Sequence, residues 1–348
     1  MSVFIIAEAG VNHNGDADRA LAMVDAARQA GADAVKFQTF SADKLAAPGA
    51  EKADYQRRET GEGGQHAMLK ALEMSEDLHH RLMVRCREVG VEFMSTPFDE
   101  EAADFLVAGG MVRIKVPSGE IVNHPLLRHL TGLDRPLIVS TGMATMDEIV
   151  DAVAVIADTR TRLGLIRPLG EMVTILHCTS NYPAAPSDVN LRAMRTIGEV
   201  TGLPIGYSDH TLGLAVSTAA VALGATVIEK HFTLDATLPG PDHRASLTVP
   251  QLSDLIAQIR DVEAALGSAI KAPTAAEIPV RALARRSVMA RRAMAAGHVL
   301  TTADLILLRP ASGIAPRFFE QIPGRALQDD VAAGQPLSWD LLSGQAFD

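Results

Sequence analysis

The sequence predicts an α/β chain, a (β/α)₈ TIM barrel followed by a smaller C-terminal domain. Three observations support this fold class. The chain has 348 residues, which is about 100 more than such a barrel needs. Over roughly the first 265 residues, short runs rich in Val, Ile and Phe alternate with amphipathic stretches, which indicates a parallel sheet. The third observation is that every run ends in polar residues, as barrel strands do around a site.

The individual elements follow from this alternation. The predicted strands are Val3–Ala7, Ala34–Gln38, Val91–Ser95, Val112–Val116, Pro136–Ser140, Val173–Cys178, Pro204–Tyr207 and Thr226–Lys230. The predicted helices are Asp16–Ala30, Glu76–Val89, Asp99–Ala108, Met146–Ala157, Asn190–Val200, Leu214–Leu223 and Pro250–Leu266. Acidic residues after Thr145 mark a helix start, and glycines such as Gly31 and Gly202 stand where helices should end.

Composition and charge exclude several classes of protein. The chain has 42 Asp and Glu against 32 Lys and Arg, a net charge of −10, so we expect no binding of nucleic acid or anionic membranes. Two cysteines, Cys86 and Cys178, exclude a disulfide framework and a four-cysteine zinc site. No stretch has the length and apolar character of a membrane span, and the first residues lack the basic region of a signal peptide. We therefore expect a cytoplasmic protein.

The predicted strand ends carry side chains that donate, accept or ionise. In chain order they include Glu8, Lys36, Gln38, Thr96, Lys115, Ser118, Glu120, Ser140, Ser208, His210, Glu229 and His231. Because the carboxyl ends of all barrel strands meet at one mouth, we expect these side chains to ring a single cavity.

Two lysines, Lys36 and Lys115, would enter this cavity together with hydroxyls from Thr96, Ser118, Ser140 and Ser208. Ammonium and hydroxyl groups suit a phosphate or a carboxylate, and a buried lysine without an anion is unfavourable. The alternative is that each lysine simply pairs with Glu8, Glu120 or Glu229.

Two histidines, His210 and His231, end neighbouring strands and are candidate ligands of one divalent metal. Glu8, Glu229 or Asp242 would support the metal directly or through water. Oxygen-rich surroundings favour Mn²⁺, ahead of Mg²⁺ or Co²⁺, over structural zinc. The connection from Ser41 to Met74 is long for this fold, and it is either a substrate-covering loop or a surface excursion.

Eight ordered motifs resemble those of the sialic acid synthase family. They are Ile6 to Gly15, Val35 to Gln38, Ser95 to Phe98, Lys115 to Glu120, Ser140 to Met143, Gly206 to Thr211, Ile228 to Phe232 and Gly240 to Asp242. Together they span the predicted barrel, residues 1–270. The resemblance implies an enzyme that condenses phosphoenolpyruvate with an N-acyl mannosamine-type sugar, giving a nine-carbon sialic acid and phosphate.

The C-terminal part of the chain resembles the small antifreeze-like (SAF) domain that ends the same family. A linker is expected at residues 271–282, where Pro273 and Pro279 stand, and the SAF domain at 283–348. In the family this domain caps the barrel of the partner chain in a domain-swapped homodimer. The resemblance implies that Arg309, in an Arg-Pro pair, reaches the sugar.

The resemblance also implies roles for individual residues. Phosphoenolpyruvate would be held by Lys36, Thr96, Lys115, Ser118, Ser140 and Ser208. Sugar or metal-bound water would contact Gln38, Phe98, Tyr182, Glu229, Asp242 and Arg309. The catalytic residues would be Glu8, Lys36, Glu120, His210 and His231, with the two histidines holding the metal.

Within the family, the chain looks most like the enzymes that use 2,4-diacetamido-2,4,6-trideoxymannose to make legionaminic acid. Classical N-acetylneuraminate synthases, which use N-acetylmannosamine, place an asparagine where this chain has Ser180. Three alternatives stay open: an N-acetylneuraminate synthase, a pseudaminic acid synthase and a metal-dependent barrel aldolase.

Overall fold

A computed structural model describes residues 2–344. The chain divides into two compact units, Met1–Gly267 and Ser268–Asp348. The predicted barrel boundary at residue 270 therefore lies three residues beyond the end of the first unit. Residues 345–348 of the predicted SAF domain lie outside the described part of the chain.

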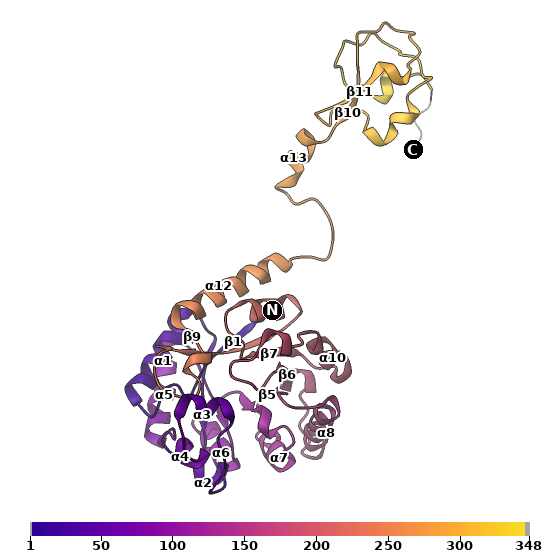
Figure 1. Cartoon of the computed structure of the whole chain (residues 1–348). Coiled ribbons are helices and arrows are strands. Elements are labelled where there is room, and N and C mark those ends of the chain that lie inside the picture. The colour runs from indigo at the N-terminus through magenta and orange to yellow at the C-terminus, as the bar shows by residue number, and fades with distance from the viewer. Residues whose placement is uncertain (1, 345–348) are drawn as a thin grey trace. The chain divides into compact units, whose positions relative to one another are not determined.

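The first unit is an eight-stranded parallel barrel (Figure 1). Its strands are β1 (Phe4–Gly10), β2 (Ala34–Thr39), β3 (Glu92–Pro97), β4 (Ile114–Val116), β5 (Leu137–Ser140), β6 (Val173–Cys178), β7 (Ile205–Asp209) and β8 (Val227–Thr233). They pair in the order β3-β2-β1-β8-β7-β6-β5-β4, so the barrel is nearly closed, and the short β9 (Leu247–Thr248) adds to β8. All eight predicted strands are confirmed, with bounds that shift by a few residues.

Helices connect the strands on the outside of the barrel. They are α1 (Ala17–Ala30), α2 (Ala42–Leu45), α3 (Asp54–Thr60), α4 (Gln65–Lys70), α5 (Glu76–Val89), α6 (Glu100–Ala108), α7 (His124–Gly132), α8 (Met146–Arg162), α9 (Leu169–Met172), α10 (Arg192–Thr201), α11 (Ala215–Ala222) and α12 (Val249–Leu266). The seven predicted helices are all present. In the part of the chain that the structure describes, no helix has both the length and the hydropathy needed to span a bilayer.

Helix α7 is the long helix that the sequence analysis missed. Pro125 stands in its first turn, where a missing backbone N–H does no harm, and the Asn123 side chain accepts from the Leu126 N–H as the N-cap. The expected linker, residues 271–282, also differs from the structure, because its second half belongs to a helix, α13 (Glu277–Ala284).

The barrel interior is layered by the two-residue repeat of its strands. A fully apolar layer contains Ile6, Ala34, Met94, Ile138, Leu176 and Val227. Each of these residues stands two positions before a cavity residue, on the same face of its strand. Gly206 fills the matching position of β7, where an added Cβ would lie 2.5 Å from the Val227 carbonyl oxygen. The apolar layer thus lies directly below the polar one.

The second unit has its own hydrophobic core. Strands β10 (Ser287–Ala290) and β11 (Leu305–Leu308) pair antiparallel, and the buried residues include Val288, Leu300 and Leu337. At the start of β11, Asp304 accepts hydrogen bonds from the Thr301 N–H and hydroxyl, and it is ion-paired with Arg292.

Candidate active site

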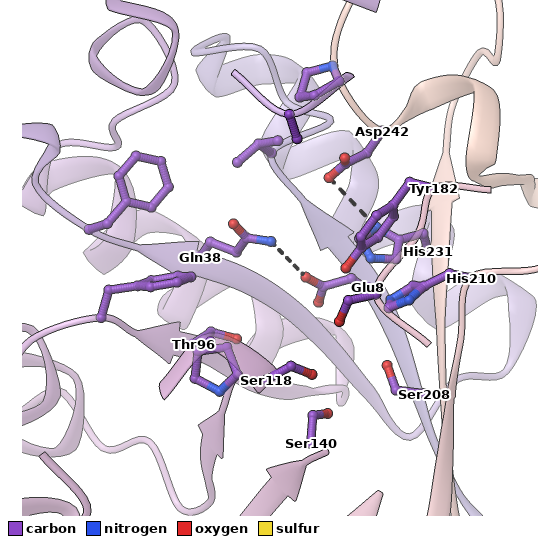
Figure 2. A pocket seen from close by; sticks show the side chains of 18 of the residues that line it. Glu8, Gln38, Thr96, Ser118, Ser140, Tyr182, Ser208, His210, His231 and Asp242 are labelled. Carbon is purple, nitrogen blue, oxygen red and sulfur yellow. Dashed lines mark hydrogen bonds and ion pairs between the residues drawn. The ribbon is translucent and has the colours of Figure 1, made fainter. Parts of the chain in front are cut away.

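The polar strand ends meet in one cavity of about 500 Å³ at the carboxyl mouth of the barrel (Figure 2). All the predicted site residues of the barrel line it. They are Glu8, Lys36, Gln38, Thr96, Phe98, Lys115, Ser118, Glu120, Ser140, Tyr182, Ser208, His210, Glu229, His231 and Asp242. Arg309, the remaining predicted residue, belongs to the second unit, where its side chain is exposed.

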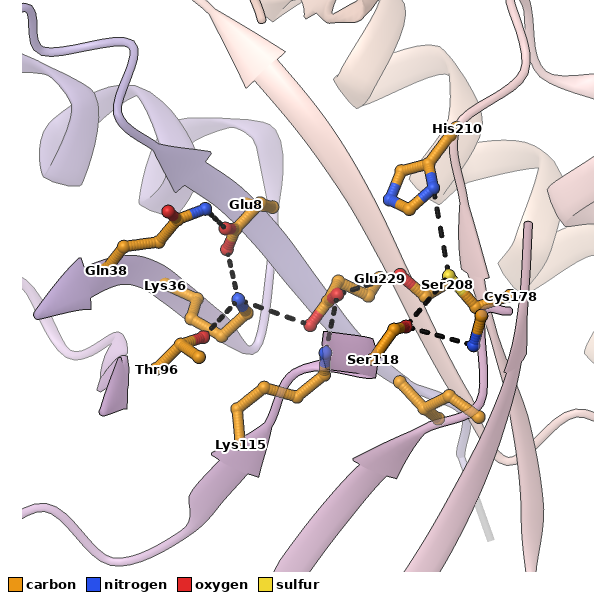
Figure 3. A network of polar contacts seen from close by, with 12 residues as sticks. Glu8, Lys36, Gln38, Thr96, Lys115, Ser118, Cys178, Ser208, His210 and Glu229 are labelled. Atoms are coloured by element: carbon orange, nitrogen blue, oxygen red, sulfur yellow. Dashed lines mark hydrogen bonds and ion pairs between the residues drawn. The ribbon is translucent and has the colours of Figure 1, made fainter. Parts of the chain in front are cut away.

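Four charged side chains that line the cavity form one network of ion pairs (Figure 3). The Lys36 Nζ lies 2.7 Å from Glu8 Oε2 and 3.6 Å from Glu229 Oε2. The Lys115 Nζ lies 3.2 Å from Glu229 Oε1, so Glu229 stands between the two lysines. The two interpretations from the sequence, an anion site and pairing with glutamates, are therefore compatible, because the lysines face the cavity and also pair with carboxylates.

Burial and ion pairing shift the pKa values of the two carboxylates of this cluster in opposite directions. Burial raises the pKa of Glu8 to about 7, against the opposing effect of Lys36. Burial also disfavours the Glu229 carboxylate, but Lys115, Lys36 and the Ser208 hydroxyl outweigh it and hold its pKa below the ordinary range. Glu229 thus stays ionised, whereas Glu8 can take or give a proton near neutral pH.

One buried polar atom beside the cluster, the Ser140 Oγ, has no hydrogen-bond partner. Nearby, Ser118 Oγ accepts from the Gly142 N–H at 3.0 Å, and Thr96 Oγ1 accepts from Lys36 at 2.8 Å. An added Cβ at Gly142 would lie 2.1 Å from Ser180 Oγ, so glycine is needed there. Buried polar groups without partners are unfavourable in an empty site, and a bound ligand would satisfy them.

The two histidines lie side by side, with ring centroids 5.4 Å apart, and Tyr182 packs on His210 at 4.0 Å (Figure 2). His210 Nδ1 lies 2.7 Å from the Thr179 carbonyl oxygen. A carbonyl only accepts, so Nδ1 carries a hydrogen, and in the neutral imidazole Nε2 then keeps a free lone pair. Burial, then His210 and Lys36, hold the pKa of His231 well below its ordinary range, which favours the neutral imidazole that metals bind.

These residues fit a divalent metal held by two imidazoles. Their ring centroids lie 5.4 Å apart, a separation at which both imidazoles could reach one ion. The buried His231 Nδ1 has no hydrogen-bond partner, and Asp242 Oδ2 lies 3.8 Å from it. Between residues 2 and 344 no group of three or more His, Cys, Asp and Glu is arranged around a metal position. Further ligands would therefore be water or substrate oxygens.

Gln38, Glu120 and Asp242 also line the cavity. Gln38 Nε2 donates to Glu8 Oε1 at 3.3 Å, and Glu120 Oε2 accepts from Asn123 at 2.7 Å. Burial raises the pKa of Asp242 to about 6. Three acids with different environments, Glu8, Glu120 and Asp242, thus face one cavity.

One wall of the cavity is apolar, and most of it was not predicted. We call it the apolar wall: Val11, Phe40, Leu45, Met68, Leu69, Leu72 and Phe98. Four of these residues lie between Ser41 and Met74, so this connection lines the cavity and folds into α2, α3 and α4 instead of an open loop. Tyr55 of α3 packs against Tyr182, with ring centroids 5.1 Å apart and the rings tilted by 31°. The sequence signal was the length of the connection, which did not reveal which side chains face inward.

A nearly closed parallel barrel, with charges, hydroxyls and imidazoles gathered at its carboxyl mouth and a separate small domain after it, defines a TIM-barrel enzyme that handles an anionic substrate. The pattern of the NeuB family matches residues 23–271, and that of the SAF domain matches residues 285–343. The chain belongs to the NeuB family and carries a SAF domain. The predicted resemblance and fold class are confirmed.

Individual relatives agree with this assignment. The chain is 49% identical over 346 residues to the N,N'-diacetyllegionaminic acid synthase of Legionella pneumophila, covering 98% of this chain and 94% of that protein. It is 42% identical to the N,N'-diacetyllegionaminic acid synthase of Campylobacter jejuni, covering 92% and 94%. A crystal structure of N-acetylneuraminic acid synthetase from Leptospira borgpetersenii superposes with a TM-score of 0.69 at 33% identity, covering 80% of this chain and 90% of that one.

Proposed function

We propose that this chain condenses phosphoenolpyruvate with 2,4-diacetamido-2,4,6-trideoxymannose, giving a legionaminic-acid-type nine-carbon sugar acid and phosphate. The observation that carries the proposal is one cavity in which two lysines and an unpartnered serine hydroxyl adjoin a histidine pair. The two relatives named as N,N'-diacetyllegionaminic acid synthases support the product.

The floor of the cavity suits the phosphate and carboxylate of phosphoenolpyruvate. Lys36 and Lys115 supply ammonium groups, and the hydroxyls of Thr96, Ser118, Ser140 and Ser208 supply further donors. Both lysines are held by carboxylates, so an incoming anion would share them with Glu8 and Glu229. Protonation of Glu8 would leave the cluster with a net positive charge and favour the anion.

The reaction joins C3 of phosphoenolpyruvate to the aldehyde carbon of the open-chain sugar. The aldehyde oxygen takes a proton, water adds to C2, and the tetrahedral intermediate loses phosphate by C–O cleavage. Glu8, whose pKa lies near 7, is positioned to transfer a proton at the reacting atoms, and Glu120 is the second candidate. The Glu229 carboxylate balances the lysines during these steps.

His210 and His231 are the proposed ligands of a divalent metal, with Mn²⁺ favoured ahead of Mg²⁺ or Co²⁺. When bound, such an ion would act as a Lewis acid toward the aldehyde oxygen. Thr179 orients His210 through its carbonyl group, and Tyr182 packs on the same imidazole. Gln38, Phe98, Tyr182 and Asp242 are then proposed to contact the sugar.

The apolar wall favours a 6-deoxy, diacetamido sugar over N-acetylmannosamine. The first sugar presents a C6 methyl and two acetyl methyls, whereas the second has hydroxyls at C4 and C6. Leu69 and Leu72 would accept methyl groups without leaving polar atoms unpaired. An N-acetylneuraminate synthase remains the second candidate, because the Leptospira structure of that name has a similar fold. A pseudaminic acid synthase is the third.

A Schiff-base aldolase fits the cavity less well. Such an enzyme needs a neutral lysine amine. Burial would lower the pKa of Lys36, but Glu229 and Glu8 outweigh burial and raise it. Borohydride treatment with sugar or pyruvate is therefore expected to trap no adduct, and a covalent lysine adduct found by mass spectrometry would favour the aldolase.

We also propose a homodimer in which the second unit caps a partner barrel and brings Arg309 to the sugar. The two units have opposite charge, which supports an attraction between them: residues 1–267 have 23 Lys and Arg against 35 Asp and Glu, whereas residues 268–348 have 9 against 7.

The two free, buried thiols, Cys86 and Cys178, suit the reducing cytoplasm.

The test is a sugar panel. Phosphoenolpyruvate is supplied with 2,4-diacetamido-2,4,6-trideoxymannose, N-acetylmannosamine or the pseudaminate precursor, and phosphate release and product mass are measured with and without EDTA. We expect fastest turnover of the diacetamido mannose and loss of turnover with EDTA. Fastest turnover of another sugar would replace the proposed substrate, and turnover that survives EDTA would exclude the metal.

Replacing Leu72 by Asn tests the apolar wall. The preference for the diacetamido sugar over N-acetylmannosamine, measured as the ratio of kcat/KM values, should fall about 10–100-fold. The KM of phosphoenolpyruvate should stay within about twofold, because Leu72 belongs to the wall and not to the charged floor. An unchanged ratio in a folded variant would show that the wall does not select the sugar.

A further inference from the structure

Strands β7 and β8 carry functional side chains on one face and a buried ion pair on the other. Ser208 and His210 at the end of β7, and Glu229 and His231 of β8, line the cavity. Asp209 and Lys230 stand between them in sequence, pair in the strand register, and do not line the cavity. Their side chains are 0% exposed. The alternation of a strand therefore places this ion pair directly behind the two histidines.

Every polar atom of this ion pair is used inside the protein. Asp209 Oδ2 lies 2.8 Å from Lys230 Nζ and accepts from the Ser217 hydroxyl at 2.6 Å. Asp209 Oδ1 accepts from the Thr211 N–H and from the Thr211 hydroxyl, each at 2.8 Å. Lys230 Nζ also donates to the Thr211 carbonyl oxygen. Neither charge is left to bind a substrate.

These contacts involve the residues on either side of His210 in the sequence. Asp209 precedes His210 and is bonded to Thr211, which follows it. Lys230 precedes His231 and bonds to Asp209 and Thr211, so one network joins the backbones that carry both imidazoles. A metal site needs its ligands within a few tenths of an ångström of the right geometry. The desolvation penalty of a buried ion pair offsets most of its attraction, so the pair adds little net stability. Such pairs can serve to define geometry.

We propose that Asp209 and Lys230 are positioning residues that hold His210 and His231 at the spacing a divalent metal requires. This inference rests on the metal-dependent function proposed above. Loss of the ion pair widens the range of distances that the two imidazoles sample, and metal affinity falls although neither residue touches the metal.

The test measures Mn²⁺ affinity in the full chain without substrates, by titration calorimetry and by the electron paramagnetic resonance signal of free Mn²⁺. The variant is Asp209→Asn with Lys230→Met, which removes both charges together and leaves an amide oxygen able to accept from Thr211. We expect the dissociation constant for Mn²⁺ to rise about 10–100-fold. The matched control is Asp134→Asn with Arg160→Met. Asp134 precedes β5, Arg160 stands in the last turn of α8, and they form an ion pair, 3.1 Å apart, at the opposite end of the strands. The control is expected to bind Mn²⁺ like the unmodified chain.

The outcomes separate this inference from the proposed function. If the unmodified chain binds no Mn²⁺, Mg²⁺ or Co²⁺, the proposed metal is wrong. If His210→Ala loses binding but the Asp209/Lys230 double variant keeps full affinity, the metal stands and the positioning role is overturned. Should the double variant fail to fold, Ser217→Ala removes one hydrogen bond from Asp209 and keeps both charges. A Mn²⁺ affinity weaker by about two- to fivefold in that variant would support the inference, and unchanged affinity would overturn it.

Discussion

Two clusters of buried charge lie on opposite faces of the barrel sheet, and they differ in how completely their polar atoms are paired. The outward pair, Asp209 and Lys230, has hydrogen bonds to both carboxylate oxygens and to the ammonium group. The inward cluster of Lys36, Lys115 and two glutamates lines an open cavity, and the buried Ser140 Oγ beside it has no hydrogen-bond partner. A satisfied cluster holds the fold in one geometry, whereas an incompletely satisfied one has capacity left for a ligand.

The largest expected effect comes from removing one of the two proposed metal ligands on the inward face. His231→Ala should lower turnover by at least about 1,000-fold, since Lewis-acid stabilisation is worth several kcal/mol. The melting temperature should change little, because His231 Nδ1 makes no hydrogen bond to lose. Phosphate release and thermal unfolding measure the two quantities. If the variant is unfolded as well as inactive, His231 on the inward face also contributes to the stability of the fold.

Lys115→Met is the next test of the inward cluster. The loss of one charge-assisted hydrogen bond to phosphoenolpyruvate, worth about 1.5–3 kcal/mol, should lower kcat/KM about 10–150-fold. Glu229 keeps Lys36 and Ser208 as partners, so we expect the protein to stay folded. Steady-state kinetics at varied phosphoenolpyruvate measure the effect, and a normal KM and kcat would remove Lys115 from the site.

The pH dependence of the free energy of unfolding should reveal the cost of burying the Glu8 carboxylate in the inward cluster. Burial raises the pKa of Glu8 to about 7, so its contribution to stability is fully present below the unfolded pKa and is lost as the pH rises through 7. Glu8→Gln should therefore gain stability relative to the unmodified, metal-free chain between about pH 5 and pH 8. Denaturant unfolding at both pH values measures this, and a constant difference would mean that Glu8 titrates normally.

The smallest expected effect concerns Asp304 in the second unit, which is satisfied like the outward pair. Hydrogen bonds from His298, Thr301 and Arg292 outweigh burial and hold its pKa below the ordinary range. Its contribution is thus present above about pH 4 and is lost as the pH falls through the lowered pKa. Asp304→Asn should reduce the stability of this unit by about 1–2 kcal/mol at neutral pH, and by less near about pH 3. Thermal unfolding at the two pH values measures this change. The pH dependence expected for Asp304 has the opposite sign to that expected for Glu8.

Much of the site was predictable because a barrel converts position along a strand into position in space. Once a residue such as Lys36 or Ser208 is known to end a strand, the fold brings it to the common mouth, and all the predicted barrel residues line the cavity. Helix α7 escaped prediction because its proline resembles a break, although a proline in the first turn is compatible with a helix.

Local pattern by itself determined the alternation of strands and helices and the polar strand ends, since a two-residue and a roughly 3.6-residue repeat are visible in the chain. The eight ordered motifs carried the resemblance to the family. Only the tertiary structure decided that Glu229 lies between both lysines, that residues 41–74 build much of the apolar wall, and that Asp209 meets Lys230 behind the histidines. These are contacts between segments distant in sequence. The distances and desolvation that set their energies exist only after the barrel has closed.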